Sequence, residues 1–184
     1  MTFLKAEKLT HLILTVSGSD HSDFLLPLLK AYSQFQCNVL NSRITAMGNE
    51  LITHFYIAGN WAGIAKLEAS LPLFESKLNV KIFAKRTGAG PDESPRIPYN
   101  IQVVGPDRIG ILFDIVQCLR KQDAHIDEIQ SDQFKAPRTG HPMATLSLTV
   151  SVPENRAITC FRESILSYCE ERNLDAYVEP YKLN

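Results

Sequence analysis

The chain has 184 residues, 45% of them hydrophobic, which is enough for one large domain or two small domains with ordinary cores. Its net charge of -1 provides no basic field for a phosphate backbone, and no apolar run approaches the roughly 18 residues of a membrane span. Its four cysteines form no CxxC pair, and we find no secretory segment. We therefore expect a cytoplasmic protein with reduced thiols, no membrane association and no direct binding of nucleic acid.

The segment from residue 87 to residue 98 divides the chain into two halves. It contains three prolines, two glycines and charges of both signs, without periodicity. Such a composition is typical of a linker. We therefore expect an N-terminal domain at 1–86, a linker at 87–98 and a C-terminal domain at 99–184.

Each half opens with a short apolar segment that ends in a glycine and has an aspartate two positions later. The glycines are Gly18 and Gly105, which are 87 positions apart (105 − 18 = 87). Apolar residues at helical spacing follow each glycine, over 25–35 in the first half and over 111–119 in the second. The repeated pattern predicts a strand and then a one-sided helix in both halves.

A hairpin is the next predicted element of each half. In the first half, 39–46 and 51–57 flank the turn signal Met47-Gly48-Asn49-Glu50. In the second half, 126–134 and the alternating segment 143–152 flank a longer loop, Lys135 to Pro142. That loop could contact a partner, although a tolerated insertion is the commoner reason for such a length.

A second helix and a closing strand complete each half. The first-half helix follows the candidate cap Asn60, and its first residue, Trp61, is more often a core anchor than a ligand platform. The order βαββαβ therefore occurs twice. We predict the α+β class, with two tandem ferredoxin-like domains whose antiparallel sheets are covered on one face by helices. The bare sheet face and the edge strand favour pairing, either between the halves or between chains as a homo-oligomer.

The junction Gly105 to Gly110 is the strongest candidate site. Its glycines permit a tight turn, and the following helix offers unpaired N–H groups and a partial positive charge. These features suit a small anion or an amino-acid carboxylate. An equally good interpretation of the geometry is a plain turn in which Asp107 caps the helix.

The run Gly105 to Ile111 resembles the loop and helix start of ACT domains. Runs in the first half resemble the glycine cleavage system transcriptional repressor family: Cys37 to Arg43, Met47 to Glu50, Gly59 to Trp61, Leu71 to Leu73 and Lys85 to Thr87. The resemblance implies two ACT domains without a helix-turn-helix. It also implies a LysR-type transcriptional activator of the glycine cleavage genes as partner, restrained when glycine is scarce.

The resemblance also implies where a ligand would bind. In ligand-binding ACT domains, the amino acid lies between the first loop of one domain and an asparagine at the start of the second strand of its partner. Asn38 stands at that position in the first half, and His125 in the second. The first-half loop has Asp23 where the motif has its second glycine, and Asp20 and Asp23 would repel a carboxylate. The implied site for a small amino acid, glycine first, is Asn38 with Gly105, Pro106, Asp107, Arg108, Ile109 and Gly110.

No catalytic or metal-binding constellation is visible in the sequence. The five histidines have no HxH or HExxH spacing, and no nucleophile elbow, Walker loop or kinase motif occurs. We therefore expect neither an enzyme nor a cofactor. Two functions remain: a regulator that binds a transcriptional activator, and a free-standing amino-acid sensor that controls a metabolic enzyme by contact.

Overall fold

The computed structural model describes residues 9–19, 23–88, 95–155 and 157–181. The chain divides into two compact units, Met1–Pro91 and Asp92–Asn184. The bordering strands continue into the segment expected to be a linker, because one ends at Thr87 and the next begins at Arg96. Residues 89–94 of that segment lie outside the described residues.

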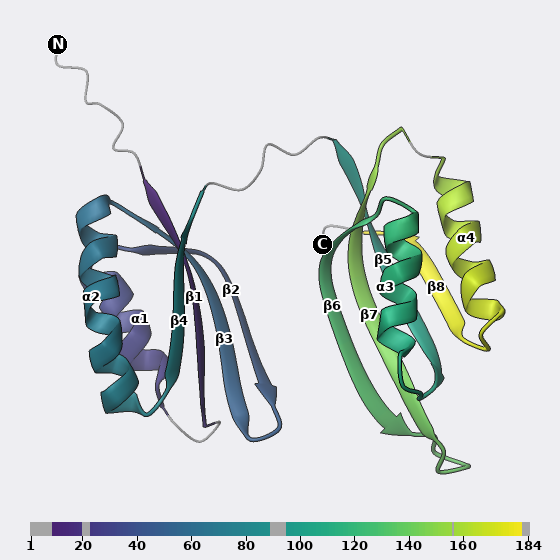
Figure 1. Cartoon of the computed structure of the whole chain (residues 1–184), viewed down its shortest axis with the longest axis horizontal. Coiled ribbons are helices and arrows are strands. Elements are labelled where there is room, and N and C mark those ends of the chain that lie inside the picture. Colours follow the sequence, from purple (N-terminus) through teal and green to yellow (C-terminus); the bar gives the residue numbers. More distant parts are fainter. Residues whose placement is uncertain (1–8, 20–22, 89–94, 156, 182–184) are drawn as a thin grey trace. The chain divides into compact units, whose positions relative to one another are not determined.

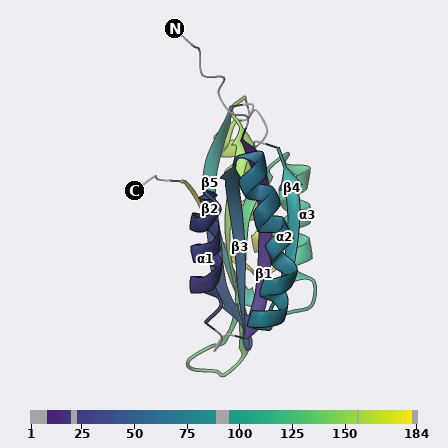
Figure 2. The same cartoon turned by 90° about the vertical axis from the view of Figure 1, so that its left-hand side faces the viewer.

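The first unit is a four-stranded antiparallel sheet with strand order β2-β3-β1-β4. Helices α1 and α2 cover one face of this sheet (Figure 1), and Figure 2 looks onto the helices with the strands behind them. Along the chain, its elements are β1 (Thr10–Ser19), α1 (Leu25–Gln34), β2 (Asn38–Met47), β3 (Glu50–Gly59), α2 (Trp61–Leu78) and β4 (Lys81–Thr87).

The second unit repeats this arrangement with strand order β6-β7-β5-β8. Its helices α3 and α4 again lie on one face of the sheet (Figure 1). The prediction of two ferredoxin-like βαββαβ units is confirmed. Along the chain, its elements are β5 (Arg96–Pro106), α3 (Ile111–Lys121), β6 (His125–Lys135), β7 (Pro142–Pro153), α4 (Ile158–Glu170) and β8 (Asp175–Pro180).

The repeat extends to single residues. Gln36 and Asp123, which are 87 positions apart, both have a left-handed backbone, with φ of 56° and 55°. The register of β2 shifts at Leu40 and that of β6 shifts at Asp127, again 87 positions apart. Beyond the hairpins the spacing is larger, because Leu51 pairs with Gly18 whereas Ala144 pairs with Gly105 (144 − 51 = 93). The second hairpin therefore contains six additional residues.

Each unit has its own hydrophobic core between its sheet and its helices. Alternate residues of the central strands are buried because successive side chains of a strand point to opposite faces. The buried hydrophobic side chains are those of Leu12, Leu14 and Val16 in β1 and those of Tyr99, Ile101 and Val103 in β5. The opposite face of each sheet carries polar and charged side chains together with exposed apolar or aromatic ones such as Phe83 and Tyr177.

Helix α2 begins as expected but differs from the prediction at its first residue. The Asn60 side chain accepts a hydrogen bond from the Gly63 N–H at 2.7 Å, which confirms the predicted cap. Trp61, however, is 66% exposed, so the preferred interpretation as a core anchor is wrong. The core-facing positions of α2 begin at Gly63 and Ile64, and the Arg86 guanidinium lies 6.0 Å from the Trp61 ring centre.

Candidate functional site

The candidate loop joins the end of β5 to the start of α3. Gly105 is a buried strand residue, and Pro106 is the exposed last residue of β5. A Cβ added at Gly105 would collide with Cδ2 of Leu174, the residue before β8. Gly18 has the same relation to Val80, with 2.6 Å from an added Cβ to Cγ1. The missing side chain at Gly105 therefore makes room for core packing rather than for a tight turn.

The turn itself depends on Gly110. Its φ of 90° and ψ of 0° match the third residue of a type II turn, a conformation that favours glycine. The Ile111 N–H donates to the Arg108 carbonyl at 3.3 Å and closes the turn. Gly110 is also the N-cap of α3, and no side chain caps this helix. Apart from the Ile111 N–H, the first-turn N–H groups of α3 therefore keep their capacity to bind an anion.

Asp107 does not cap α3, so that interpretation of the sequence is wrong. Its Oδ2 accepts a hydrogen bond from Nε2 of Gln133 on β6, at 2.9 Å. Its N–H donates to the carbonyl of Pro142, the first residue of β7, at 3.0 Å. Two contacts thus hold the loop against the long hairpin of the same unit.

Arg108 folds back onto the helix that follows it. Its Nη2 lies 2.6 Å from Oδ2 of Asp114, an acid in the first turn of α3. An acid at this position also interacts favourably with the positive end of the helix. Ile109, which lies between Arg108 and Gly110 in the turn, is fully exposed, with a fractional exposure of 103%. The loop therefore presents an apolar side chain beside a paired guanidinium.

Asn38 is the exposed first residue of β2, where it pairs with Ala58. His125 begins β6 in the same way, and its Nε2 lies 3.7 Å from Oδ1 of Asp127. Asn38 belongs to the first unit, whereas Gly105 to Gly110 belong to the second. The shared ligand site therefore stays a prediction.

The corresponding first-unit loop is described only at its ends. Asp20 lies outside the described residues, and Asp23 is exposed. Phe24, not an aspartate, is the N-cap of α1, and its side chain is buried. This helix start thus differs from that of α3, whose N-cap is an exposed glycine.

Sequence reasoning missed three residues that surround the second loop: Asp114, Gln133 and Pro142. The strand register indicates Gln133, because Gln133 and Gly105 both pair with Ala144. The preference for acids in a first helical turn indicates Asp114. The hydrogen bond from the Asp107 N–H to the Pro142 carbonyl depends on the length of the hairpin between β6 and β7. A local sequence pattern does not indicate this length.

The remaining reactive side chains are dispersed. Cys37, Cys118 and Cys169 are buried free thiols, and Cys160 is an exposed one. Within the described ranges, no three His, Cys, Asp or Glu side chains are grouped so that they could hold a metal ion. None of the described helices has the length and apolarity needed to cross a membrane.

Residues 10–85 match the sequence model of the ACT domain family. The glycine cleavage system transcriptional repressor of Escherichia coli (strain K12) is 24% identical over 165 residues, which cover 89% of this chain and 86% of that protein. The protein of the same name from Shigella flexneri is equally similar, with 24% identity over the same shares of both chains.

Two crystal structures share the fold of the whole chain. An unknown protein from Galdieria sulphuraria has a TM-score of 0.74 at 21% identity, covering 95% of this chain and all of that one. A protein described provisionally as a glycine cleavage system transcriptional repressor also has a TM-score of 0.74, at 18% identity, with 95% and 99% coverage. Proteins with the same tandem architecture are thus known.

Proposed function

We propose that this chain is a cytoplasmic regulator of glycine metabolism that senses a small amino acid and restrains a LysR-type activator of the glycine cleavage genes. The observation that supports this proposal is the start of α3 at Gly110, which no side chain caps and which suits an anion. Similarity to glycine cleavage repressors over 89% of the chain supports the choice of pathway. In this role the chain needs no catalytic activity and no cofactor.

The proposed ligand is glycine, held by its two charged groups. Its carboxylate would accept hydrogen bonds from the first-turn N–H groups of α3, beside Arg108. The amide of Asn38, from a facing first unit, would contact the ammonium or the carboxylate. Glycine has no side chain to bury, so we expect micromolar to millimolar dissociation constants, corresponding to roughly 4 to 8 kcal/mol.

Calorimetry with glycine and with serine tests the site. Gly110→Asp places an acid where the carboxylate would bind, and Asn38→Ala removes the facing amide. Gly140→Asp is the matched control, because Gly140 also has a positive φ of 71° and open space around it but lies at the hairpin tip. We expect Gly110→Asp to abolish the heat of binding, Asn38→Ala to weaken binding and Gly140→Asp to bind normally. Unchanged heats in both test variants would place the ligand elsewhere.

Co-purification from native lysate tests the partner. Recovery of a LysR-type protein supports the proposal, whereas recovery of a metabolic enzyme would favour a sensor that controls that enzyme by contact.

The purified chain alone should show no sequence-specific, salt-sensitive binding to glycine cleavage promoter DNA, because a net charge of -1 provides few phosphate contacts. A tight specific complex of the isolated chain with DNA would contradict partner-mediated action.

A further inference from the structure

The two units carry opposite charges at equivalent positions of their uncovered sheet faces. On β4, Lys81, Phe83 and Lys85 pair with Ser17, Thr15 and Ile13 of β1, residues that alternate with the buried ones. On β8, the corresponding residues are Asp175, Tyr177 and Glu179, each 94 positions later (175 − 81 = 94). A basic–aromatic–basic row in one unit thus becomes an acidic–aromatic–acidic row in the other.

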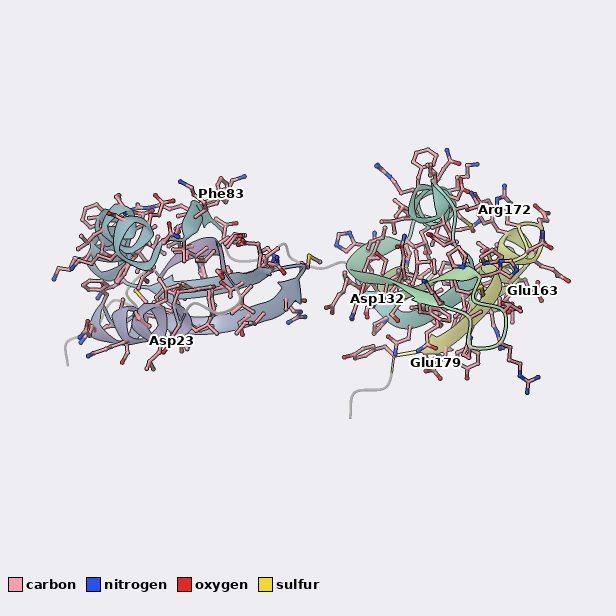
Figure 3. All side chains as sticks on the ribbon, turned by 90° about the horizontal axis from the view of Figure 1, so that it is seen from below. Asp23, Phe83, Asp132, Glu163, Arg172 and Glu179 are labelled. Carbon is pink, nitrogen blue, oxygen red and sulfur yellow. The ribbon has the colours of Figure 1, made fainter. Side chains whose placement is uncertain are left out.

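The rest of the first face has the same character. We define the basic face as the sheet surface of the first unit that is not covered by α1 and α2. Arg43 on β2 adds a third cation, and Glu50 is the acid on this face. Phe83 is 61% exposed on the same surface (Figure 3). The surface therefore offers positive charge around exposed apolar groups.

The second face has the opposite character. We define the acidic face as the sheet surface of the second unit that is not covered by α3 and α4. Glu128 and Asp132 on β6 share this surface with Asp175 and Glu179, because all four pair with residues that alternate with the buried ones of the central strands. Those residues are Thr149, Thr145, Val104 and Asn100. Tyr177 is 55% exposed there. Asp132 and Glu179 lie on opposite edge strands of this sheet (Figure 3).

We propose that the basic face of one copy of this chain packs against the acidic face of a second copy, and that the pairing is reciprocal. Face-to-face packing of sheets covers the exposed aromatic rings and brings opposite charges together at the edges. Two basic faces, or two acidic faces, would instead place like charges against each other. The charge pattern therefore favours pairing of unlike faces, which occurs twice in an isologous two-fold dimer.

The area of the faces fits a stable dimer. Four strands about 4.8 Å apart and about seven residues long, at roughly 3.3 Å each, form a face of about 440 Å². A reciprocal dimer covers four such faces, about 1,800 Å² in total, within the roughly 1,200 to 2,000 Å² that is usual for specific interfaces. A single pair of faces would cover only about half of that area, which favours the reciprocal form.

Charge reversal in the full chain tests the proposal by sedimentation equilibrium. One variant carries Lys81→Glu and Lys85→Glu, and the other carries Asp175→Lys and Glu179→Lys. We expect the wild type to be dimeric. The dimer dissociation constant of each variant should be about 100-fold higher or more than that of the wild type, because each variant places like charges against each other. The matched control is Lys30→Glu with Lys66→Glu, two exposed lysines on the helices of the first unit. The control should dimerise like the wild type.

Mixing the two reversed variants provides the decisive result. Each variant alone has two faces of like charge, but an equimolar mixture has complementary faces between unlike chains. We expect a heterodimer of wild-type affinity that weakens as salt rises. A chain carrying all four substitutions should also dimerise, which shows that the substituted strands still fold.

Three outcomes would overturn the proposal. The first is a wild-type chain that stays monomeric at high concentration, and the second is a dimer dissociation constant that the charge reversals leave unchanged. The third is that the two reversed variants do not associate when they are mixed. A fourth would assign the basic face to another occupant. If the wild type binds single-stranded RNA and only Lys81→Glu with Lys85→Glu abolishes this binding, then nucleic acid and not a second copy covers the face.

Discussion

The side-chain amide of Gln133 donates a hydrogen bond to the carboxylate of Asp107, with 2.9 Å between Nε2 and Oδ2. This contact ties the candidate ligand loop to β6, one of the two edge strands of its sheet. A movement of the loop would therefore reach the strand that borders the acidic face. The contact joins the proposed ligand loop to a strand of the proposed dimer surface.

A double-mutant cycle should detect this contact. We expect Asp107→Ala and Gln133→Ala each to lower the free energy of unfolding by about 0.5 to 1.5 kcal/mol, as is usual for a single hydrogen bond. The double variant should lose less than the sum, since the contact can be lost only once. Urea denaturation measures the three values. Gln130 lies on the opposite face of β6, so the losses in free energy of unfolding caused by Gln130→Ala and Asp107→Ala should add. Additive losses for Gln133→Ala and Asp107→Ala would contradict a direct contact.

Gly105→Ala should destabilise the second unit by about 1 to 3 kcal/mol, because the new methyl group would overlap Leu174 in a packed core. Leu174→Ala alone should also destabilise it, since Leu174 is buried. The combined variant should lose less free energy of unfolding than the sum of the two single losses, because the smaller side chain at position 174 makes room for the methyl group at position 105. Thermal or urea unfolding checks this, with Gly88→Ala as control at a glycine that has open space around it. A Gly105→Ala protein of wild-type stability would refute the packing role.

Asp114→Asn should strengthen the binding of glycine severalfold. The change removes a negative charge from the first turn of α3 and releases Arg108 from its 2.6 Å ion pair. It should cost at most about 1 kcal/mol of stability, since the pair is partly exposed. Calorimetry compares Asp114→Asn with Asp132→Asn, which removes the same charge from β6. Weaker binding in Asp114→Asn would instead make the intact ion pair part of the site.

The exposed thiol should react with iodoacetamide before the three buried thiols at pH 8. Burial raises the pKa of Cys169 to about 11 and also raises the pKa of Cys37 and of Cys118. A thiol with a pKa of about 11 is only about 0.1% thiolate at pH 8, and the thiolate is the reactive form. Peptide mapping should therefore find Cys160 labelled first in the folded chain and all four labelled in urea. Equal labelling of Cys169 and Cys160 in the folded chain would contradict the packing of α4.

The order of elements could be predicted because each element has its own period. Alternation in 143–152 and helical spacing in 111–119 reflect local geometry, and β7 and α3 follow them closely. Trp61 was misplaced because a bulky side chain at a helix start belongs to the core only if the helix is rotated to bury it. In α2 the rotation buries Ile64 and Leu67 instead.

The candidate site was predictable only in part. Gly110 follows from its motif, because a tight turn before a helix has a local signature in sequence. The partner of Asp107 does not, since Gln133 is 26 positions away and reaches the loop through the register of β6. The opposite charges of the two sheet faces lie in the sequence, but they become a pattern only after the register has placed Lys81 and Asp175 at equivalent positions.

The six additional residues of the second hairpin offer a route to an optical reporter. The Ala136 N–H donates to the His141 carbonyl and the Gly140 N–H donates to the Ala136 carbonyl, which closes the hairpin loop. Its tip at Arg138 and Thr139 can therefore accept a dye or a small fluorescent domain without disturbing β6 and β7. Pro142, directly after this loop, holds the Asp107 N–H of the candidate site. If glycine binds at this loop as proposed, a fluorophore at the tip would report its occupancy inside living cells, so that changes in glycine concentration could be followed.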